Sequence, residues 1–482
     1  MSIRCMVSWV VVGILVGVMA VPLRADPMAD GIRQVRQQVV PSTVIVSFYV
    51  ERDDGARADF MTIGTVVGPN NLVMFSSTAI AAQFALAQFH EFQVVIAKGD
   101  DLQTFDAEYL GKDDQAQVAF LRVTDPKAPN LPVLTFDHET PVEVGDPVLT
   151  LSSLGEPDGW DRLVQLARVC GRTDQPTTLY LASPALGSPG TPILTLDGKA
   201  IGIVGFTRLN RATNARPNWT VVPVVWPTAR FLERIQNPPQ GGIIVKHPWL
   251  GVHTLTPVTK DMAEYFNLGD RRGVVIGHVV ENGPAAKAGL KAGDIILAVN
   301  GEAVKGTEGQ LVDNFTYGLR ERPVGEKIDL EIWRDTKTET VNVQLDEEPK
   351  GAAEVERYQN TPFGLTVREL VLADTIVREL PTTETGVVVA FLAPAGWAQD
   401  GGLQEGDIVK KVQDREVRTL ADFQKIFEEE IAKKPKEIVL FVLRGKKETQ
   451  LLRIEPRWDA AATPPADTAP AQPTPPVEEG KS

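Results

Sequence analysis

Two stretches of this 482-residue chain read Gly289-Leu290-Lys291-Ala292-Gly293-Asp294-Ile295-Ile296 and Gly402-Leu403-Gln404-Glu405-Gly406-Asp407-Ile408-Val409. They belong to an internal repeat in which residues 273–304 align without gaps to residues 386–417, with 12 of 32 positions identical. The glycines permit a tight turn where a Cβ would clash, and the aspartate can bond to local backbone amides before the apolar run enters a strand. An offset of 113 residues between the copies indicates tandem domains rather than a short-period solenoid.

The residues that follow the block complete the pattern. In the first copy the strand ends at Asn300-Gly301, which is a hairpin signal, whereas Gln413-Asp414 in the second copy changes the turn but not the strand pattern. The repeat resembles PDZ domains, particularly those attached to bacterial HtrA proteases, over about 248–346 and 362–456. This resemblance implies recognition of peptides, usually C-terminal ones, which add a strand to an open sheet edge.

The family's carboxylate loop has the form aromatic-Leu-Gly-aliphatic. Trp249-Leu250-Gly251-Val252 matches this form well, whereas Pro362-Phe363-Gly364-Leu365 places its aromatic residue at the leucine position. The resemblance implies that these loops bind peptide through Trp249, Leu250, Gly251 and Val252 and through Phe363, Gly364 and Leu365. The alternative is that both loops are only strand entries, with Trp249 packing at an interdomain seam.

The region before the repeats predicts a mostly β fold. Short apolar runs separated by Gly, Pro, Asn and Asp are typical of sandwich or barrel strands, and they lie at 43–50, 64–67, 94–97, 118–123, 147–151, 178–182 and 199–206. We expect one helical stretch near Thr78–Phe89, and a second after Pro227, where Phe231, Leu232 and Ile235 have helical spacing.

Four segments of this region resemble the trypsin-like domain of the HtrA family. They are Val40–Val44, Ile63–Val67, Val144–Leu149 and Trp219–Pro223, in the family's order. The resemblance implies a trypsin-like double β-barrel domain over 26–237, followed by two PDZ domains.

The family's catalytic triad can be compared position by position. The segments 73–80, 117–122 and 187–193 match the family's His, Asp and Ser segments and place Thr78, Gln117 and Pro189 at the triad positions. Nucleophilic catalysis by this triad needs a hydroxyl, an imidazole base and a carboxylate, so all three groups are absent. Proline also lacks the backbone N–H that the nucleophile contributes to the oxyanion hole. We therefore predict that the chain has no catalytic residues and is not an enzyme.

One arrangement could rescue activity. Ser188 is one residue from the nucleophile position, and His90 could serve as its base, although a one-residue shift re-aims the side chain. The chain would then be a residual serine endopeptidase with a non-standard nucleophile. No His-x-x-x-His or similar ligand spacing occurs, so we predict no metal site and no cofactor.

The ends of the chain and its linkers have distinctive compositions. Residues 1–25 carry Arg4 and an apolar run over Val7–Ala20 that is short for a membrane span, which predicts a signal peptide. The Pro- and Gly-bearing segments 238–247 and 347–361 are predicted linkers, and the Ala/Pro-rich residues 457–482 a disordered tail.

The net charge and the cysteine content argue against two classes of protein, nucleic-acid-binding proteins and disulfide-stabilised secreted modules. The formal charge of −14 disfavours nucleic-acid binding. Once the predicted signal peptide is removed, only Cys170 remains, so no internal disulfide can form, and its apolar neighbours predict a buried, inert thiol. An exported chain without a disulfide fits a bacterial periplasm or cell surface, with no membrane span after signal cleavage.

These observations predict an exported HtrA-like pseudoprotease that binds peptides or C-termini of extracytoplasmic proteins as a scaffold, sensor or chaperone-like protein. The former substrate cleft could serve as a second peptide groove. The alternatives are the residual endopeptidase and a structural envelope protein with vestigial PDZ grooves. Family resemblance implies a homo-oligomer, specifically a trimer, but Asp26–Gln38 lacks the aromatic residues of a family-style trimer contact.

Overall fold

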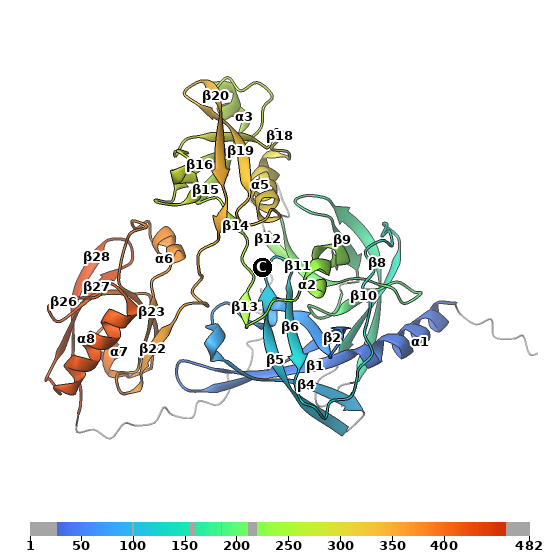
Figure 1. Cartoon of the computed structure of the whole chain (residues 1–482), viewed down its shortest axis with the longest axis horizontal. Coiled ribbons are helices and arrows are strands. Elements are labelled where there is room, and N and C mark those ends of the chain that lie inside the picture. Colours follow the sequence, from blue (N-terminus) through green and yellow to red (C-terminus); the bar gives the residue numbers. More distant parts are fainter. Residues whose placement is uncertain (1–26, 99–100, 154–160, 185, 211–218, 459–482) are drawn as a thin grey trace, which may run out of the picture.

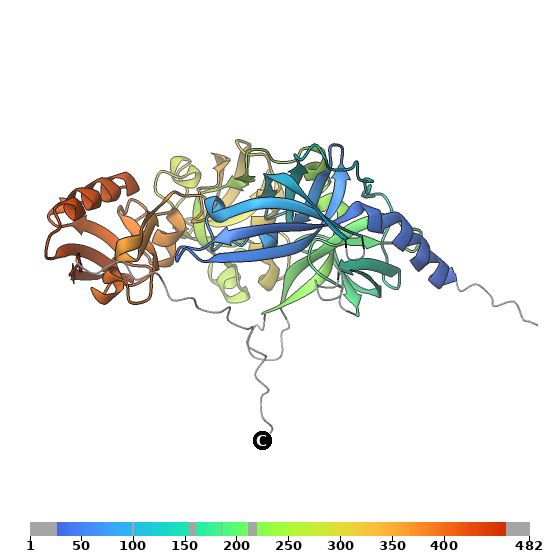
Figure 2. The same cartoon turned by 90° about the horizontal axis from the view of Figure 1, so that it is seen from below.

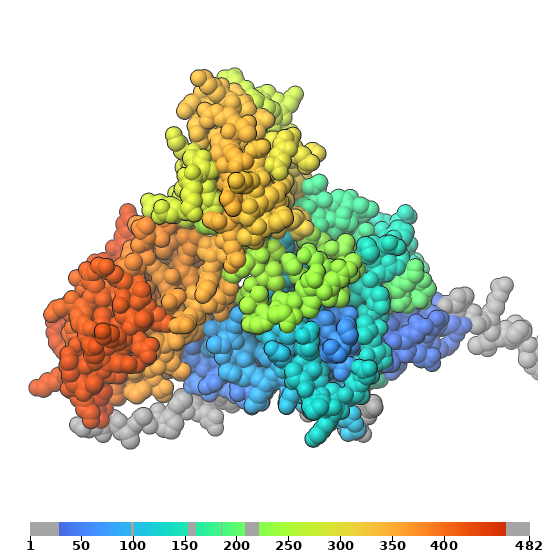
Figure 3. All heavy atoms as spheres, viewed as in Figure 1, coloured from blue at the N-terminus to red at the C-terminus, as the bar shows by residue number. Residues whose placement is uncertain are grey.

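The computed structural model describes residues 27–98, 101–153, 161–184, 186–210 and 219–458. The predicted signal peptide and nearly all of the predicted tail lie outside these residues. An N-terminal two-barrel domain occupies the right of Figure 1, the first repeat lies at the top and the second repeat at the left. The space-filling view shows the same three bodies with the first repeat seated on the two-barrel domain (Figure 3).

The first barrel follows helix α1 (Pro27–Val39) and has six strands. Their hydrogen-bonded order is β5-β4-β1-β2-β3-β6, and pairing of β5 with β6 closes the barrel. Its interior is filled by alternate side chains such as Val44, Val46 and Phe48, as expected for strands with one buried face. The strands are β1 (Thr43–Glu51), β2 (Arg57–Gly68), β3 (Leu72–Ser76), β4 (Phe89–Lys98), β5 (Asp101–Asp113) and β6 (Val118–Val123).

The second barrel closes in the order β10-β11-β12-β9-β8-β7. An apolar cluster that includes Met74, Phe120, Leu149 and Leu194 joins the two barrels and α1. Figure 2 shows α1 beside the barrels, at the right of the view. The double-barrel prediction is therefore confirmed, and so is the closing helix α2 (Leu232–Gln236). The strands are β7 (Pro147–Ser153), β8 (Arg162–Thr173), β9 (Leu179–Ser183), β10 (Pro192–Leu194), β11 (Ala200–Asn210) and β12 (Trp219–Pro227).

Two local predictions are wrong. The stretch Thr78–Phe89 holds only two single 3₁₀ turns, Ser77–Ala79 and Leu86–Gln88, and β4 begins at Phe89. Its helix-like apolar spacing arises because Phe84, Leu86 and Phe89 pack against the first barrel's core. Cys170 is exposed rather than buried, because the alternation of β8 buries Ala167 and Val169 and turns residue 170 to the opposite face.

The first repeat is a six-stranded sheet in which five strands follow the order β15-β16-β17-β19-β20 and β18 pairs with β17. β14 and β21 form a separate pair. Helix α5 packs against β14, β15 and β16. Its elements are β14 (Pro248–Trp249), β15 (Val252–Pro257), α3 (Lys260–Tyr265), β16 (Val274–Val279), α4 (Pro284–Lys287), β17 (Ile295–Val299), β18 (Glu302–Ala303), α5 (Leu311–Arg320), β19 (Lys327–Arg334), β20 (Lys337–Gln344) and β21 (Asp346–Glu347).

The second repeat has the corresponding order β23-β24-β25-β27-β28, with one further strand, β22, on the outer edge of β23. Its elements are β22 (Arg357–Asn360), β23 (Leu365–Glu369), α6 (Leu372–Val377), β24 (Val387–Leu392), α7 (Trp397–Asp400), β25 (Ile408–Val412), β26 (Arg415–Glu416), α8 (Leu420–Ala432), β27 (Ile438–Arg444) and β28 (Glu448–Ile454).

The repeated Gly-Asp block performs the same task in both copies. Gly289 and Gly293 have φ of +82° and +93°, which favours glycine. The Asp294 carboxylate accepts a hydrogen bond from the Lys291 backbone N–H at 2.8 Å, and it also binds Arg334 through two nitrogens. In the second copy Asp407 binds the Gln404 N–H and Arg444 in the same way. The expected backbone bonds are present, whereas the arginine partners were not foreseen.

Both predicted linkers contribute strands. Within 238–247, β13 (Ile243–Ile244) pairs in parallel with β5 at Gly111 and Lys112. Within 347–361, β22 pairs with β23. Neither segment is therefore a free tether.

Candidate functional site

The three segments that match the catalytic triad meet where the barrels join. The Ser77 N–H donates a hydrogen bond to the Gln117 carbonyl oxygen at 3.3 Å. Gly190 lies so close to Ser76 that a Cβ on Gly190 would stand 2.7 Å from the Ser76 nitrogen. Thr78, Gln117 and Pro189, each within two residues of these contacts, thus belong to one site.

At the histidine position, Thr78 is exposed and its Oγ1 lies 2.8 Å from the buried Ser76 Oγ. The two hydroxyls share a hydrogen bond, and the Thr78 N–H donates to Ser76 Oγ at 3.3 Å. A threonine hydroxyl does not accept a proton near neutral pH. Ser76 therefore caps the 3₁₀ turn Ser77–Ala79, and the hydroxyl of Thr78 is not a general base.

At the aspartate position, Gln117 joins the two barrels. Its Nε2 donates to the Phe206 carbonyl oxygen at 2.8 Å, and the Phe206 N–H donates to Gln117 Oε1 at 2.9 Å. Phe206 lies on β11 of the second barrel, whereas Gln117 precedes β6 of the first. Because a carboxylate could only accept, the amide makes a reciprocal pair of bonds that Asp could not make.

At the serine position, the loop before β10 is organised by Thr191. The Thr191 N–H and Oγ1 both donate to the Ser188 carbonyl oxygen, at 3.3 and 2.7 Å. Thr191 Oγ1 also lies 3.0 Å from Thr150 Oγ1. Ser188 is exposed, and Pro189 has no N–H to offer an oxyanion.

The histidines have other surroundings. His90 lies in β4, where its Nε2 is 3.6 Å from Glu51 Oε2 and its ring lies 5.2 Å from the Tyr49 ring. His253 stacks on His278 at 4.7 Å between ring centroids, and His247 contacts Asp113. Among the described residues, no hydrogen bond joins Ser188 to His90, so the alternative nucleophile and base are not in contact. Within the same residues, no group of three or more His, Cys, Asp or Glu is placed to hold a metal ion.

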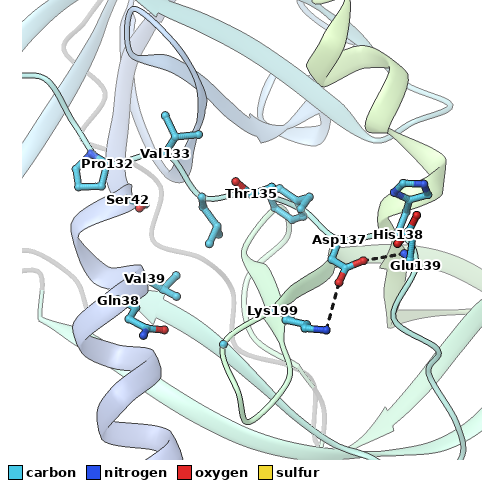
Figure 4. A pocket seen from close by; sticks show the side chains of 13 residues that line it. Gln38, Val39, Ser42, Pro132, Val133, Thr135, Asp137, His138, Glu139 and Lys199 are labelled. Carbon is cyan, nitrogen blue, oxygen red and sulfur yellow. Dashed lines mark hydrogen bonds and ion pairs between the residues drawn. The ribbon is translucent and has the colours of Figure 1, made fainter.

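A pocket of about 620 Å³ lies beside the end of α1. It is lined by residues including Ser42, His138 and Lys199 (Figure 4). The Asp137 carboxylate in this pocket accepts hydrogen bonds from the Thr140 hydroxyl and from the backbone N–H groups of Glu139 and Thr140, which lower its pKa to about 2. None of the three triad positions lines this pocket.

A buried ionic cluster, not singled out from the sequence, anchors the first predicted linker. His247 Nε2 lies 3.0 Å from Asp113 Oδ1, and Arg234 Nε donates to Asp113 Oδ2 at 2.7 Å. Burial alone would raise the pKa of Asp113. Hydrogen bonds from His247, the Ala116 N–H and Arg234 outweigh it and lower the pKa to about 2. The first repeat is thereby fixed to the first barrel.

The first repeat has an open edge at the predicted peptide site. Among the described residues no strand pairs with the outer side of β15, which lies beside α5. At the start of β15 the Gly251 and Leu250 carbonyl oxygens accept bonds from Val280 and Ala285, which holds the loop in shape. Leu250 is buried against the α5 residue cluster, whereas Trp249 and Val252 are half-buried. This is the geometry that strand addition requires.

The second repeat has no such open edge. Phe363 is fully buried and its ring packs against Trp397, Phe427 and Trp458. Leu365 also lies in the core, and Gly364 supplies the positive φ of +62° that the loop needs. The outer side of β23 is occupied by β22. The predicted ligand contacts of Phe363 and Leu365 thus fall on core residues.

Comparison with known proteins fits this architecture. A trypsin-like peptidase domain model matches residues 48–203, and a PDZ domain model matches residues 249–345. The chain is 30% identical over 346 residues to a "Probable periplasmic serine endoprotease DegP-like" of Rhizobium meliloti, covering 70% of this chain and 64% of that protein. A protein of the same name from Brucella suis is 29% identical over 353 residues, or 69% of this chain and 63% of that one.

The chain belongs to the HtrA/DegP-like family. It spans a little under two thirds of the length of these relatives. A solved structure of a variant of the HtrA-type protease AlgW with a decapeptide has the same fold, with a TM-score of 0.51 and 18% identity over 66% of this chain and 98% of that one. Within the described residues, no helix of this HtrA-like chain is long and apolar enough to cross a membrane.

Proposed function

We propose that this HtrA/DegP-like chain binds extended polypeptide segments and does not cleave them. The observation that carries the proposal is the use of Thr78, Gln117 and Pro189 at the barrel junction. The side chains of Thr78 and Gln117 make structural hydrogen bonds there, and the backbone nitrogen of Pro189 carries no hydrogen to donate.

The expected loss of catalysis is large. In a related type of site, removal of a single oxyanion-hole donor costs about 10²–10³ in rate. Loss of nucleophile and base removes most of the remaining acceleration. Three independent losses in one site favour a binding role over residual turnover.

Peptide binding is proposed at the edge of β15. That edge is open and lies beside α5, and the loop Trp249–Val252 precedes it. We further propose that residues 362–456 form a second PDZ domain, because the repeats share a strand order and the second repeat has the Asp407–Arg444 pair. The chain would act in the periplasm or outside the cell, as a scaffold, sensor or chaperone-like protein. Homo-oligomerisation is proposed from family membership.

Three assays on the purified chain test the proposal. A fluorophosphonate probe should not label the protein, and casein should stay intact, while an active HtrA protease serves as the positive control. Stoichiometric labelling that disappears in Ser188→Ala would overturn the proposal and establish the residual endopeptidase instead. Failure of every C-terminal peptide in a library to bind tighter than about 1 mM would favour the structural envelope role.

A further inference from the structure

The two faces of β22 contact two different domains. Side chains alternate along a strand, so Arg357 and Gln359 lie on one face and Tyr358 and Asn360 on the other. Arg357 and Gln359 contact the hairpin between β1 and β2 at Asp53. Tyr358 packs on the core of the second repeat, where Asn360 is also buried. The strand therefore lies between the first barrel and the second repeat (Figure 1).

The inner face of β22 occupies the second repeat as an added peptide strand would. It runs antiparallel to β23, with Asn360 opposite Leu365 and Tyr358 opposite Val367. Helix α8 contacts both β22 and β23, and the Tyr358 ring lies 5.9 Å from the Phe423 ring of α8. The C-terminal end of β22 points toward the Phe363–Gly364 loop. In the first repeat, no strand within the described ranges pairs with the matching edge of β15.

The outer face of β22 is held by the first barrel. Arg357 Nη1 lies 2.8 Å from Asp53 Oδ2, and the two side chains are only 15% and 17% exposed. Gln359 Nε2 donates to the Asp53 carbonyl oxygen at 2.8 Å. Ala353, which precedes β22, makes a further contact with the first barrel: its carbonyl oxygen accepts a hydrogen bond from the Leu86 N–H at 2.9 Å. These contacts fix the second repeat to the first barrel through β22.

We propose that residues 357–360 are the resident ligand of the second repeat's groove, and that an extended peptide which displaces them releases this repeat from the first barrel. The inference rests on the proposal that the second repeat is a PDZ domain. The displacing peptide would carry a free carboxylate and an aromatic side chain in the place of Tyr358. Only four residues pair with β23, so a peptide of similar length can replace them.

Hydrogen exchange of the full chain tests the exchange of ligands. The probe is a heptapeptide with the sequence of residues 354–360 and a free C-terminus. Saturating probe should keep the amides of 365–369 protected while exchange at 357–360 and at Leu86 rises. Unchanged exchange at Leu86, or protection confined to 252–257 of the first repeat, would overturn the proposal.

A matched pair of variants measures the contribution of the outer contact. Asp53→Asn removes the charge that holds Arg357, and we expect the probe's affinity to rise about fivefold, the worth of one partly exposed ion pair. Glu429→Gln removes the exposed ion pair between Glu429 of α8 and Arg415 of β26, so the affinity should not change. Equal affinities in wild type and Asp53→Asn contradict the proposal.

Tyr358→Ala provides a second measurement within the groove itself. Removing the ring that packs on Phe423 should raise both the exchange at 357–360 and the probe's affinity. No change in either would show that β22 is a permanent strand. These readouts do not depend on fluorophosphonate labelling or on peptide binding to the first repeat, so failure of the proposed function would be recognised separately.

Discussion

The two repeats share a strand order and a buried aspartate–arginine pair, but their leading segments go to different places. Residues 244–247 and 357–360 occupy equivalent positions at the offset of 113. The first segment adds to β5 of the first barrel and ends at the buried His247–Asp113 contact. The second turns back onto its own sheet as β22. The two repeats can therefore share a core while the segment before each repeat determines whether a strand pairs with the edge of its first sheet strand.

The difference has a physical origin in the hydrogen-bonding needs of an exposed strand edge. An unpaired edge presents N–H and C=O groups that attract another strand. In the second repeat the chain itself supplies that strand, whereas no strand of the described residues pairs with the outer edge of β15, where we propose that a peptide binds. Substitutions at equivalent positions of the two repeats can therefore distinguish effects on the shared core from effects on peptide binding.

The largest effect is expected at the shared core. Arg334→Ala and Arg444→Ala each leave a carboxylate, Asp294 or Asp407, buried without its partner. Each should lower the free energy of unfolding of its own repeat by about 3 kcal/mol. Urea unfolding followed by hydrogen exchange would measure the two losses. A much smaller loss in one repeat would show that the two cores are not equivalent, and Arg415→Ala is the exposed control.

An intermediate effect is expected at the anchor of the first leading segment. The pKa of Asp113 is lowered from 3.8 to about 2. The charged carboxylate therefore stabilises the folded state at pH values above 3.8. That stabilisation, about 2 kcal/mol, is lost as the pH falls toward about 2.

Urea unfolding of wild type and Asp113→Asn at about pH 5 and about pH 2 checks this expectation. The two proteins should differ at the higher pH and converge at the lower one. A difference that stays constant across this range would show that the Asp113 carboxylate does not anchor the segment.

The smallest change in stability is expected for substitutions at Gly251 and Gly364. These two substitutions should nevertheless differ most in their effect on peptide affinity. A Cβ on Gly251 or Gly364 would lie 2.8 Å from a neighbouring carbon, and both residues have positive φ. Gly251→Ala and Gly364→Ala should each cost about 1–2 kcal/mol. Only Gly251→Ala should weaken binding of a labelled C-terminal peptide to the first repeat, by about tenfold or more, because Gly364 lies in the second repeat, where β22 pairs with β23. Fluorescence anisotropy distinguishes the two, and equal losses of affinity would break the comparison.

Much of the fold was predictable from local patterns. The glycine pairs, the Asp294 and Asp407 caps and the Asn300-Gly301 turn follow from short-range sterics and hydrogen bonding, and all are present. The helix expected over Thr78–Phe89 was wrong because apolar spacing alone cannot distinguish a helix from side chains that reach a barrel core from a loop. Cys170 was misplaced for a similar reason, since its exposure depends on which face of β8 turns inward.

The candidate site divides in the same way. The residues alone predict which groups stand at the triad positions, because Thr78 has no imidazole, Gln117 has no carboxylate and Pro189 has no backbone N–H. Tertiary contacts were needed to show that Gln117 bonds to Phe206 and that His247 contacts Asp113. They also show that β22 pairs with β23, whereas no described strand pairs with the outer edge of β15. These contacts join residues separated by tens to hundreds of positions or depend on which strand edge is left unpaired, and neither is encoded in the periodicity of a short segment.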